Sequence, residues 1–546
     1  MKRFSYFLLA FAICASSVCS FAAVKLPKLI SNGMVVQRGE PVKLWGWADP
    51  GETVAVAAKS LVKKPKYKAS ASAVADADGK WEVELPAMPA GGPYALTIGD
   101  VNVTDVLSGD VLLCSGQSNM QLPVNRVTDM FADEIAAYEN PQIRHFTVPN
   151  VVEFHKPAED LPYGDWRALT QDNVMQFSAL AYFLAKELYA RNGGVPVGIV
   201  NSSWGGTPIE AWISEDCLAS FPMAIAEKRI YEDDGYRQRI KQLESENYAR
   251  WDRNLYALDP GKQAKVQWSA DGLDVSDWAD VDMLSKEWAS DGLNPANGSH
   301  WWRKSVNLPA SAAGKEAVLR MGCIVDADSV YVNGQFVGTV SYQYPPRIYK
   351  VPAGLLREGE NNITVRMLSQ NGFPHFVAEK PYKLICDGAE YSLDGTWKYR
   401  RGAVMPHGPG MEFWCYKPTV LYNAMIHPLA NCKFAAAVWY QGESNVDRRN
   451  QYAQLLQTMI ANWRHDLDDA ELPFYIVELA GFLSPDDTVG QASWAQMRAQ
   501  QAKAAEATEG ATLIHNSDLG EWNDIHPLDK KTLARRIADA MLGEKK

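Results

Sequence analysis

The sequence predicts an α/β fold in which helices cover a doubly wound parallel sheet, with one β-sandwich before the sheet and a second β-sandwich inserted into it. Two patterns support this prediction. Apolar runs that end in glycine or polar residues alternate with helical patterns over much of the chain, as in parallel strands buried on both faces. Two other regions show only the period-two alternation of short strands. A chain of 546 residues is also too long for a single hydrophobic core.

Residues 1–23 have the features of a cleaved secretory signal peptide. Lys2 and Arg3 precede an apolar stretch over residues 7–13, and small residues lead to Ala23. This stretch is too short to span a membrane. The residues before Cys19 make a poor lipoprotein signal, so a lipid anchor is the less favoured alternative. We therefore expect a secreted or periplasmic protein.

Residues 24–105 are expected to form the N-terminal β-sandwich. Apolar and polar residues alternate there between turn sequences such as Asp-Pro-Gly, Asp-Gly and Gly-Gly. Short strands that alternate in this way, with frequent turns between them, are typical of small all-β domains.

Five apolar runs predict the parallel strands. They are residues 111–116, 195–206, 433–444, 472–481 and 511–520. Helical patterns over residues 176–194, 449–466 and 493–507 lie between them, and the first of these patterns ends in two glycines. We therefore assign residues 106–262 and 401–546 to two parts of one α/β domain.

Residues 263–400 interrupt this alternation with strand after strand. Asn333 and Gly334 form a turn sequence that predicts a hairpin over residues 328–339. The region is expected to be an independent inserted β-sandwich. Its pattern resembles the jelly-roll, carbohydrate-binding-like sandwiches that are attached to glycoside hydrolases.

The composition narrows the class of partner. The formal net charge is −11 and no basic run is present, which argues against a nucleic acid partner. The sequence contains no His-Glu-x-x-His motif, no Cys-x-x-Cys motif and no Rossmann glycine fingerprint, so no metal or cofactor is expected. Six cysteines follow the predicted signal peptide. Their wide spacing leaves open whether they form disulfides or remain buried thiols.

Four polar clusters follow predicted strands. They are CSGQSNM at residues 114–120, NSSWGGTP at 201–208, WYQGESN at 439–445 and DLGEWNDIHP at 518–527. Ligands of such sheets bind outside the carboxyl ends of the strands, so we expect these clusters to converge. Gly116 permits a sharp turn, and Ser118 then stands where its N–H can meet an oxyanion. A nucleophilic serine requires a base, and His526 follows the last predicted strand.

These motifs resemble those of the SGNH (GDSL-like) hydrolases, in the branch that contains sialate O-acetylesterases and some carbohydrate acetylesterases. GQSNM at residues 116–120 resembles the nucleophile block. WGGTPIEAW, WYQGESN and DIHP follow in that branch's order, and the resemblance covers nearly the whole chain after residue 23. It implies an SGNH-type sheet and a carboxylic ester hydrolase.

The resemblance also implies a role for each matching position. Ser118 is the expected nucleophile and His526 the expected general base. The N–H of Ser118 and that of Gly205, with Gly206 as the alternative, are the expected oxyanion-hole donors. Gln441 is the expected third donor.

Other positions are expected to orient the substrate or the site. Glu443 is expected to be an orienting carboxylate, and Asn445 is an alternative donor to Gln441. Arg126 follows the nucleophile and is a candidate partner for a substrate carboxylate, although a solvated or structural arginine is the favoured alternative.

The expected acid departs from the usual superfamily pattern. Many members carry an aspartate three residues before the histidine, where this chain has Asn523. Asp524, two residues before His526, is the expected third member of a triad. The alternative is a Ser–His dyad, in which the imidazole bonds to a backbone carbonyl instead of a carboxylate.

The expected function is that of a secreted serine esterase that removes O-acetyl groups from sialic acids through an acetyl-Ser118 intermediate. Within the same class, an acetylesterase of xylan or other glycans is the alternative. A non-catalytic carbohydrate-binding protein is the alternative of another class. The expected partner is an acetylated glycan, with no membrane span. Because His526 must be neutral to accept a proton, we expect kcat/KM to fall as the pH falls through the usual range of histidine.

Overall fold

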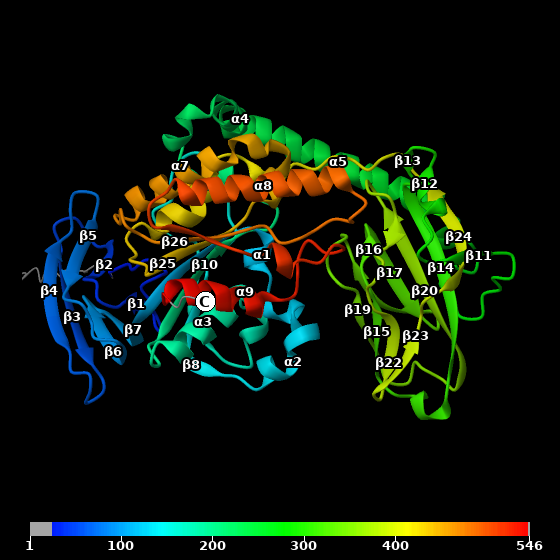
Figure 1. Cartoon of the computed structure of the whole chain (residues 1–546), viewed down its shortest axis with the longest axis horizontal. Helices are drawn as coiled ribbons and strands as arrows, with labels where there is room; N and C mark the ends of the chain where they lie inside the picture. The colour runs from blue at the N-terminus through cyan, green and yellow to red at the C-terminus, as the bar shows by residue number, and fades with distance from the viewer. Residues whose placement is uncertain (1–23, 544–546) are drawn as a thin grey trace, which may run out of the picture.

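The computed structural model describes residues 24–543, so the predicted signal peptide lies outside the described residues. Three regions follow one another along the long axis of the molecule (Figure 1): the N-terminal strands, a central α/β region, and the inserted strands at the opposite end. The prediction of a mixed α/β fold with a parallel sheet at its centre is confirmed.

The central sheet has the strand order β27-β26-β25-β7-β10-β8-β9, and β9 alone in this order is antiparallel to its neighbour. The strands are β7 (Val101–Gly116), β8 (Asn140–Thr147), β9 (Trp166–Leu169), β10 (Val197–Ser203), β25 (Ala436–Tyr440), β26 (Phe474–Val477) and β27 (Ala511–Ile514). The chain builds β8 and β10 on one side of β7 and the last three strands on the other. This reversal at β7 is where doubly wound sheets bind ligands.

Helices cover both faces of this sheet. The helices of the described residues are α1 (Ser118–Gln121), α2 (Thr128–Ala136), α3 (Ala179–Arg191), α4 (Pro222–Glu232), α5 (Asp234–Leu258), α6 (Pro260–Gln263), α7 (Tyr452–Asp466), α8 (Thr488–Glu506) and α9 (Lys530–Met541), of which α5 and α6 pack against the inserted strands. Figure 1 shows α7 and α8 on one side of the sheet and α3 and α9 on the other. The short 3₁₀ segments include Val124–Arg126, Ile209–Trp212, Glu443–Gln451 and Ser517–Leu519.

The side chains of β7 alternate between two apolar cores. Val111 and Leu113 pack in the core that includes α7 and α8, whereas Leu112 and Cys114 pack in the core that includes α3 and α9. Both faces of the strand are therefore buried, which explains why the run is apolar at every position. The prediction of doubly buried parallel strands is confirmed at this strand.

Helix α3 shows why the helical pattern ends where it does. The Ser178 hydroxyl accepts a hydrogen bond from the Ala181 N–H at 3.2 Å, which caps the first turn. Gly193 and Gly194 follow the last turn with φ values of 67° and 76°. Glycine adopts this left-handed conformation without steric cost, so the helix stops there.

The N-terminal strands are β1 (Val35–Gln37), β2 (Val42–Trp47), β3 (Thr53–Ser60), β4 (Lys68–Val74), β5 (Lys80–Leu85) and β6 (Gly91–Ile98). Strands β3, β4 and β6 pair in one sheet, and β2 pairs with β5. Strand β7 joins this region to the next, because its first half pairs with β6 and β1 and its second half with β10 and β25. The expected boundary between residues 105 and 106 falls inside this strand.

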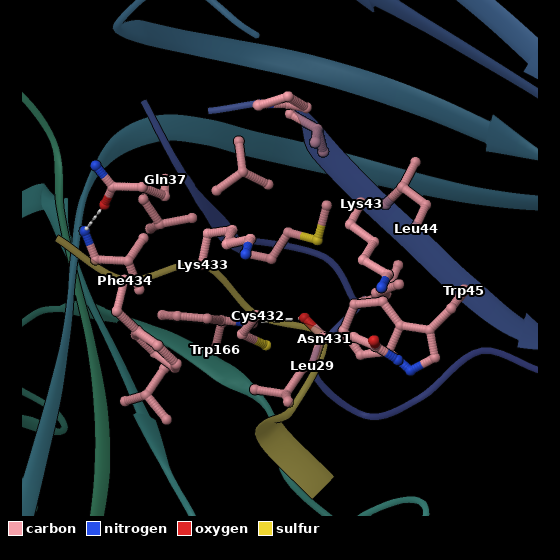
Figure 2. Close-up of a pocket in the computed structure, with 18 residues that line it drawn as sticks. Leu29, Gln37, Lys43, Leu44, Trp45, Trp166, Asn431, Cys432, Lys433 and Phe434 are labelled. Atoms are coloured by element: carbon pink, nitrogen blue, oxygen red, sulfur yellow. Dashed lines mark hydrogen bonds between the residues drawn. The ribbon is translucent and has the colours of Figure 1, made fainter. Parts of the chain in front are cut away.

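An apolar cavity of about 60 Å³ lies at the junction between the N-terminal strands and the α/β region (Figure 2). The Gln37 Oε1 accepts a hydrogen bond from the Val111 N–H at 2.9 Å at its edge. Leu29, Leu44 and Trp166 form part of its wall. None of the predicted site residues lines this cavity, so we assign it to packing between the two regions.

The inserted strands form two main antiparallel sheets around one apolar core. The larger contains β11 (Ala279–Asp282), β24 (Thr396–Val404), β14 (Gly298–Leu308), β20 (Gly359–Ser369), β17 (Ala327–Val332) and β18 (Gln335–Val340). The smaller contains β19 (Ile348–Val351), β15 (Ala317–Met321), β22 (Tyr382–Cys386) and β23 (Ala389–Ser392). Two short pairs are β12 (Ser290–Asp291) with β13 (Asn294–Pro295), and β16 (Ile324–Val325) with β21 (His375–Phe376). The predicted hairpin is confirmed, because Val332 pairs with Gln335 across Asn333 and Gly334.

The cysteines of the described residues are free thiols. They are Cys114, Cys217, Cys323, Cys386, Cys415 and Cys432. Of the two possibilities that the sequence left open, the structure shows the thiols. Burial raises the pKa of Cys114 and that of Cys432 to about 12, so both remain protonated at neutral pH.

We expect Gly116→Ala to destabilise the sheet strongly. Gly116 has a φ of 136°, and a β-carbon there would lie 2.1 Å from the carbonyl oxygen of Tyr440 on β25. The clash is with backbone, so the variant should lose about 3 kcal/mol or more, or fail to fold. Gly193→Ala is the control, because Gly193 has a φ of 67° but open space around it, and it should lose only about 1–2 kcal/mol. Urea unfolding of both variants measures the difference, and equal losses would contradict the prediction.

Candidate functional site

The turn that carries Ser118 is fixed to the neighbouring strand. The Gln117 N–H donates to the Tyr440 carbonyl at 3.0 Å. The Gln117 side chain is 2% exposed, and its Oε1 accepts the N–H groups of Gly442 at 3.4 Å and Ser444 at 3.3 Å. Ser118 is the first residue of α1, where a backbone N–H has no carbonyl partner within the helix. The first and third polar clusters therefore meet beside Ser118, as predicted.

The second cluster also reaches Ser118. A β-carbon at Gly205 would lie 3.3 Å from the Ser118 Cβ, and the Trp204 N–H donates to the Gly116 carbonyl at 3.1 Å. The Gly205 N–H donates to the Oε1 of Gln121 at 2.8 Å. A substrate oxygen that used the Gly205 N–H would therefore take the place of the Gln121 amide oxygen.

Gln441 is buried and its side chain is fully engaged. Its Nε2 donates to the Thr207 carbonyl at 3.1 Å and to the Asn445 Oδ1 at 2.8 Å, and its Oε1 accepts from the Tyr452 hydroxyl at 2.8 Å. Both amide hydrogens thus have protein acceptors. This geometry favours a supporting role under the Gly205 loop over the predicted role of oxyanion donor.

Asn445, the alternative donor, is engaged in the same way. Its Oδ1 accepts from the Ile209 N–H at 2.9 Å, and its Nδ2 donates to the Glu210 carboxylate at 2.8 Å. Asn445 is fully buried. Together with Gln441 it ties the third cluster to residues that directly follow Gly205 and Gly206. Because an amide side chain suits both roles, the sequence could not separate them.

A buried network that sequence reasoning missed joins the turn that carries Ser118 to the loop that carries His526. The Asn119 Nδ2 donates to the Glu443 Oε1 at 2.7 Å and to the Ile525 carbonyl at 2.9 Å. Its Oδ1 accepts from the Lys530 Nζ at 2.7 Å. Asn119 and Lys530 are each 1% exposed. The residue after Ser118 is thus bonded to the residue before His526, and the only sequence signal was that Asn119 belongs to the GQSNM motif.

Burial shifts the charges of this network towards neutrality. It raises the pKa of Glu443 above its usual value, against the opposing effect of the hydrogen bond from Asn119. It lowers the pKa of Lys530 to about 7, against the carboxylates of Glu443, Asp524 and other acidic residues. The predicted orienting carboxylate therefore orients Asn119, and it has one buried oxygen, Oε2, without a partner among the described residues.

His526 lies in this site with a nearly buried imidazole that is 8% exposed. The Asp524 Oδ1 accepts the His526 backbone N–H at 2.9 Å but lies 3.7 Å from the Nδ1 of the ring. Within residues 24–543 the Nδ1 has no hydrogen-bond partner, and no hydrogen bond joins the Ser118 hydroxyl to the imidazole. In the free protein the Asp524 carboxylate thus bonds to the backbone of His526 and not to its ring, whereas a triad requires a bond to the ring.

The ring of His526 meets the insert. Tyr344, in the loop after β18, lies edge-on to the imidazole with ring centroids 5.4 Å apart. The guanidinium of Arg126 donates to the Tyr344 carbonyl at 3.4 Å, while its Nε is buried and has no partner in the described part of the chain. Burial, followed by the charges of Lys530 and Arg126, lowers the pKa of His526 to about 3.

A cavity of about 260 Å³ opens beside the histidine loop, between the insert and the α/β region. Its wall includes Tyr344 and His375 from the insert and Phe482, Trp522 and Asp524 from the α/β region. Across residues 24–543, no group of three histidine, cysteine or acidic residues is arranged to hold a metal ion. No helix in the same range is long and apolar enough to cross a membrane.

Comparison with known proteins gives one family match and several relatives. The family model described as "Carbohydrate esterase, sialic acid-specific acetylesterase" matches residues 108–246 and 406–543. Sialate O-acetylesterases of Mus musculus and Homo sapiens are 35% and 36% identical over 212 and 204 residues, or 35% and 34% of this chain. The aligned parts cover 37% and 38% of those proteins, which is less than two thirds of either.

A solved structure is similar over a greater length. The crystal structure of a carbohydrate acetylesterase from Xanthomonas citri matches with a TM-score of 0.56 and 26% sequence identity. The match covers 96% of this chain and 77% of the other. Both the matched family segments and this structure span the two parts of the chain on either side of the insert.

We expect the imidazole of His526 to remain neutral from pH 8 to pH 5. Its folded-state pKa of about 3 lies below the usual 6.5 because burial and two neighbouring cations oppose protonation. The folded ring should therefore take up a proton only near pH 3, and the loss of rate expected from the sequence moves to that lower pH. Histidine ¹⁵N NMR, with His526→Asn to assign the signal and the urea-unfolded chain as reference, measures this. A midpoint near 6.5 in the folded chain would contradict the prediction.

Proposed function

The chain belongs to the carbohydrate esterase family of sialic acid-specific acetylesterases, and on that premise we propose that it is a serine esterase that removes O-acetyl groups from sialic acids. The observation that carries the proposal is that Gly205 lies against Ser118 at the sheet edge where the strand order reverses, and that Asn119 is hydrogen-bonded to the residue before His526. The hydrogen bond from Asn119 to the Ile525 carbonyl holds the nucleophile and the histidine segments together.

The proposed reaction has two steps. The Ser118 hydroxyl oxygen attacks the acetyl carbonyl carbon while the imidazole of His526 takes its proton. The negative oxygen of the tetrahedral intermediate accepts hydrogen bonds from the N–H groups of Ser118 and Gly205. The bond to the sugar oxygen then breaks, that oxygen receives the proton from His526, and an acetyl-Ser118 ester remains.

Water completes the cycle. His526 takes a proton from a water molecule, which attacks the acetyl carbon of the acetyl-Ser118 ester. The Ser118 oxygen leaves, regains the proton, and acetate is released. The low pKa of His526 in the free protein keeps the ring in its proton-accepting form across neutral and mildly acidic pH. The mechanism requires no metal.

Arg126 supports a sialic acid as the sugar. Its charge is close enough to depress the pKa of His526, and its buried Nε has no partner among the residues described. A sialic acid carries a carboxylate, whereas an acetylated xylose unit carries none. A guanidinium beside the base can pair with that carboxylate, which favours the predicted substrate role over a structural one.

Several finer assignments belong to the same proposal. The chain is exported through its N-terminal segment, and the N-terminal strands and the insert are β-sandwiches of about residues 24–105 and 263–400. The jelly-roll-like assignment of the insert is supported by its two antiparallel sheets, which share one apolar core. We assign the insert a carbohydrate-binding-like fold on this basis.

Replacement of the nucleophile tests the reaction. Ser118→Ala should lower acetate release from O-acetylated sialic acids by about 10³-fold or more, with unfolding by urea unchanged, because no acyl-enzyme can form. Ser72→Ala, at an exposed position of β4, is the control and should be fully active. Near-normal turnover by Ser118→Ala would overturn the serine mechanism. A wild-type chain that binds the glycan but releases no acetate would be a carbohydrate-binding protein.

Replacement of Arg126 tests the substrate. Arg126→Met should raise KM for O-acetylated sialic acids by about tenfold or more, because a charge-assisted hydrogen bond contributes about 1.5–3 kcal/mol. KM for p-nitrophenyl acetate and for acetylated oligosaccharides built of xylose alone, which carry no carboxylate, should not change. These neutral esters also control for any effect of Arg126 on His526. Equal losses on all three substrates would contradict the proposed carboxylate contact.

A further inference from the structure

The loop that carries His526 depends on contacts with other parts of the chain. Residues 520–529 lie between the short helix Ser517–Leu519 and α9, and their regular pairing is one isolated bridge between Glu521 and Asp524. A loop with so little pairing of its own takes its shape from the groups that surround it. The Asn119 bond to the Ile525 carbonyl holds it from the α/β side.

Three consecutive residues of the insert hold the same loop from the other side. The Asn523 Nδ2 donates to the Ala378 carbonyl at 2.8 Å, and the Trp522 indole donates to the Glu379 carboxylate at 2.9 Å. The Lys380 Nζ donates to the carboxylates of Glu521 and Asp524, which precede and follow Trp522 and Asn523 in the loop. Every residue from 521 to 524 is thus bonded to the segment between β21 and β22.

Lys380 contacts two carboxylates that bond to the backbone around the histidine. Its Nζ lies 3.1 Å from the Glu521 Oε2 and 3.2 Å from the Asp524 Oδ2. The other oxygen of Asp524 accepts the N–H of His526 at 2.9 Å, and the other oxygen of Glu521 accepts the N–H of Leu528 at 3.0 Å. One lysine therefore fixes both acceptors of the backbone segment that contains His526.

Burial makes these ion pairs strong constraints. The side chains of Lys380 and Asp524 are only 13% and 12% exposed. Without the lysine, two neighbouring carboxylates would repel one another in a poorly solvated place. Burial lowers the pKa of Lys380, but the two carboxylates outweigh it and raise this pKa above its usual value, so the lysine stays charged.

The segment that carries Lys380 is anchored in the insert. The Val377 N–H donates to the Cys323 carbonyl at 3.0 Å, and the Val377 carbonyl accepts the Tyr382 hydroxyl at 2.8 Å. Tyr382 is 4% exposed and packs in the core of the insert. The position of Lys380 is therefore set by the insert and not by the α/β region.

We propose that Lys380 is a positioning residue through which the insert holds His526 in place for reaction with Ser118. This inference rests on the proposed function of the chain. It gives the insert a role in the reaction besides any contact with a glycan. Displacement of a reacting group by about 1 Å can cost about 10²-fold in rate, so a loosened histidine loop has a large kinetic effect.

The test compares Lys380→Met with Lys383→Met. Lys383 belongs to the same insert, on β22, and pairs with the exposed Glu390 instead of the histidine loop. Lys380→Met should lower kcat for acetyl esters by about 10²-fold with KM unchanged, and Lys383→Met should lower neither. Lys380→Arg keeps the charge and should recover most of the rate, a rescue that a purely structural defect would not show.

Two further measurements do not depend on the glycan. Labelling of Ser118 by a fluorophosphonate requires the Ser118–His526 pair, and its rate should fall with kcat in Lys380→Met. Hydrogen exchange measured by mass spectrometry should become faster at residues 525–528, where the N–H groups of His526 and Leu528 lose their fixed acceptors. If Lys380→Met does not fold, Lys380→Gln takes its place in each measurement.

The outcomes separate this inference from the proposed function. If Lys380→Met and Lys380→Gln match Lys383→Met in kcat, labelling and exchange, the positioning role is wrong, whatever the substrate. If the wild type releases no acetate but Ser118 is labelled, the proposed substrate is wrong, and the labelling and exchange rates still decide the role of Lys380. Equal losses in Lys380→Arg and Lys380→Met would also overturn it.

Several charged or titratable side chains surround His526 and Asp524. The variants of Lys380 change only one of these side chains. These groups are Arg126, Cys323, Tyr344, Lys380, Glu521 and Lys530.

Discussion

The site depends above all on the side-chain amide of Asn119. Its two hydrogens bond to Glu443 and to the Ile525 carbonyl, and its oxygen accepts from Lys530. Three segments that are far apart in the sequence therefore meet at one planar group. An amide serves this purpose because it donates two hydrogen bonds and accepts others in a fixed plane, which a carboxylate or an ammonium group cannot do. The turn that carries Ser118 and the loop that carries His526 are therefore positioned relative to one another by one side chain.

The electrostatics of the site follow from the same burial. An acid and a base packed around Asn119 both shift towards their neutral forms, as the pKa of Glu443 rises and that of Lys530 falls to about 7. His526 is likewise held neutral by burial and by nearby cations. Burial excludes water around these groups, so the backbone N–H groups near Ser118 act in a place of low dielectric constant, where hydrogen bonds to the charge that would develop on a bound ester are most effective.

Sequence patterns predicted the parallel sheet and the meeting of its polar clusters well, because both follow from local rules of burial and strand direction. They predicted less about the role of each side chain. Gln441 and Asn445 are amides in the right cluster, but their hydrogens point to protein acceptors. The contact between Lys380 and Asp524 joins residues 144 positions apart. It depends on how a whole inserted region docks, which no local pattern encodes. The depressed pKa of His526 likewise arises only once the loops pack around it.

Strand β7 has a consequence for the mechanics of the molecule. It belongs to the N-terminal sheet at Leu107 and to the central sheet from Asp110 onward, without an intervening linker. Ordinary domains are joined by flexible segments that permit hinge motion, whereas a continuous strand transmits force along its hydrogen-bonded ladders. The N-terminal region therefore acts as a rigid extension of the strand that ends at the Ser118 turn. A shortened chain that began at residue 106 would cut through this strand and expose the edge that β6 now covers.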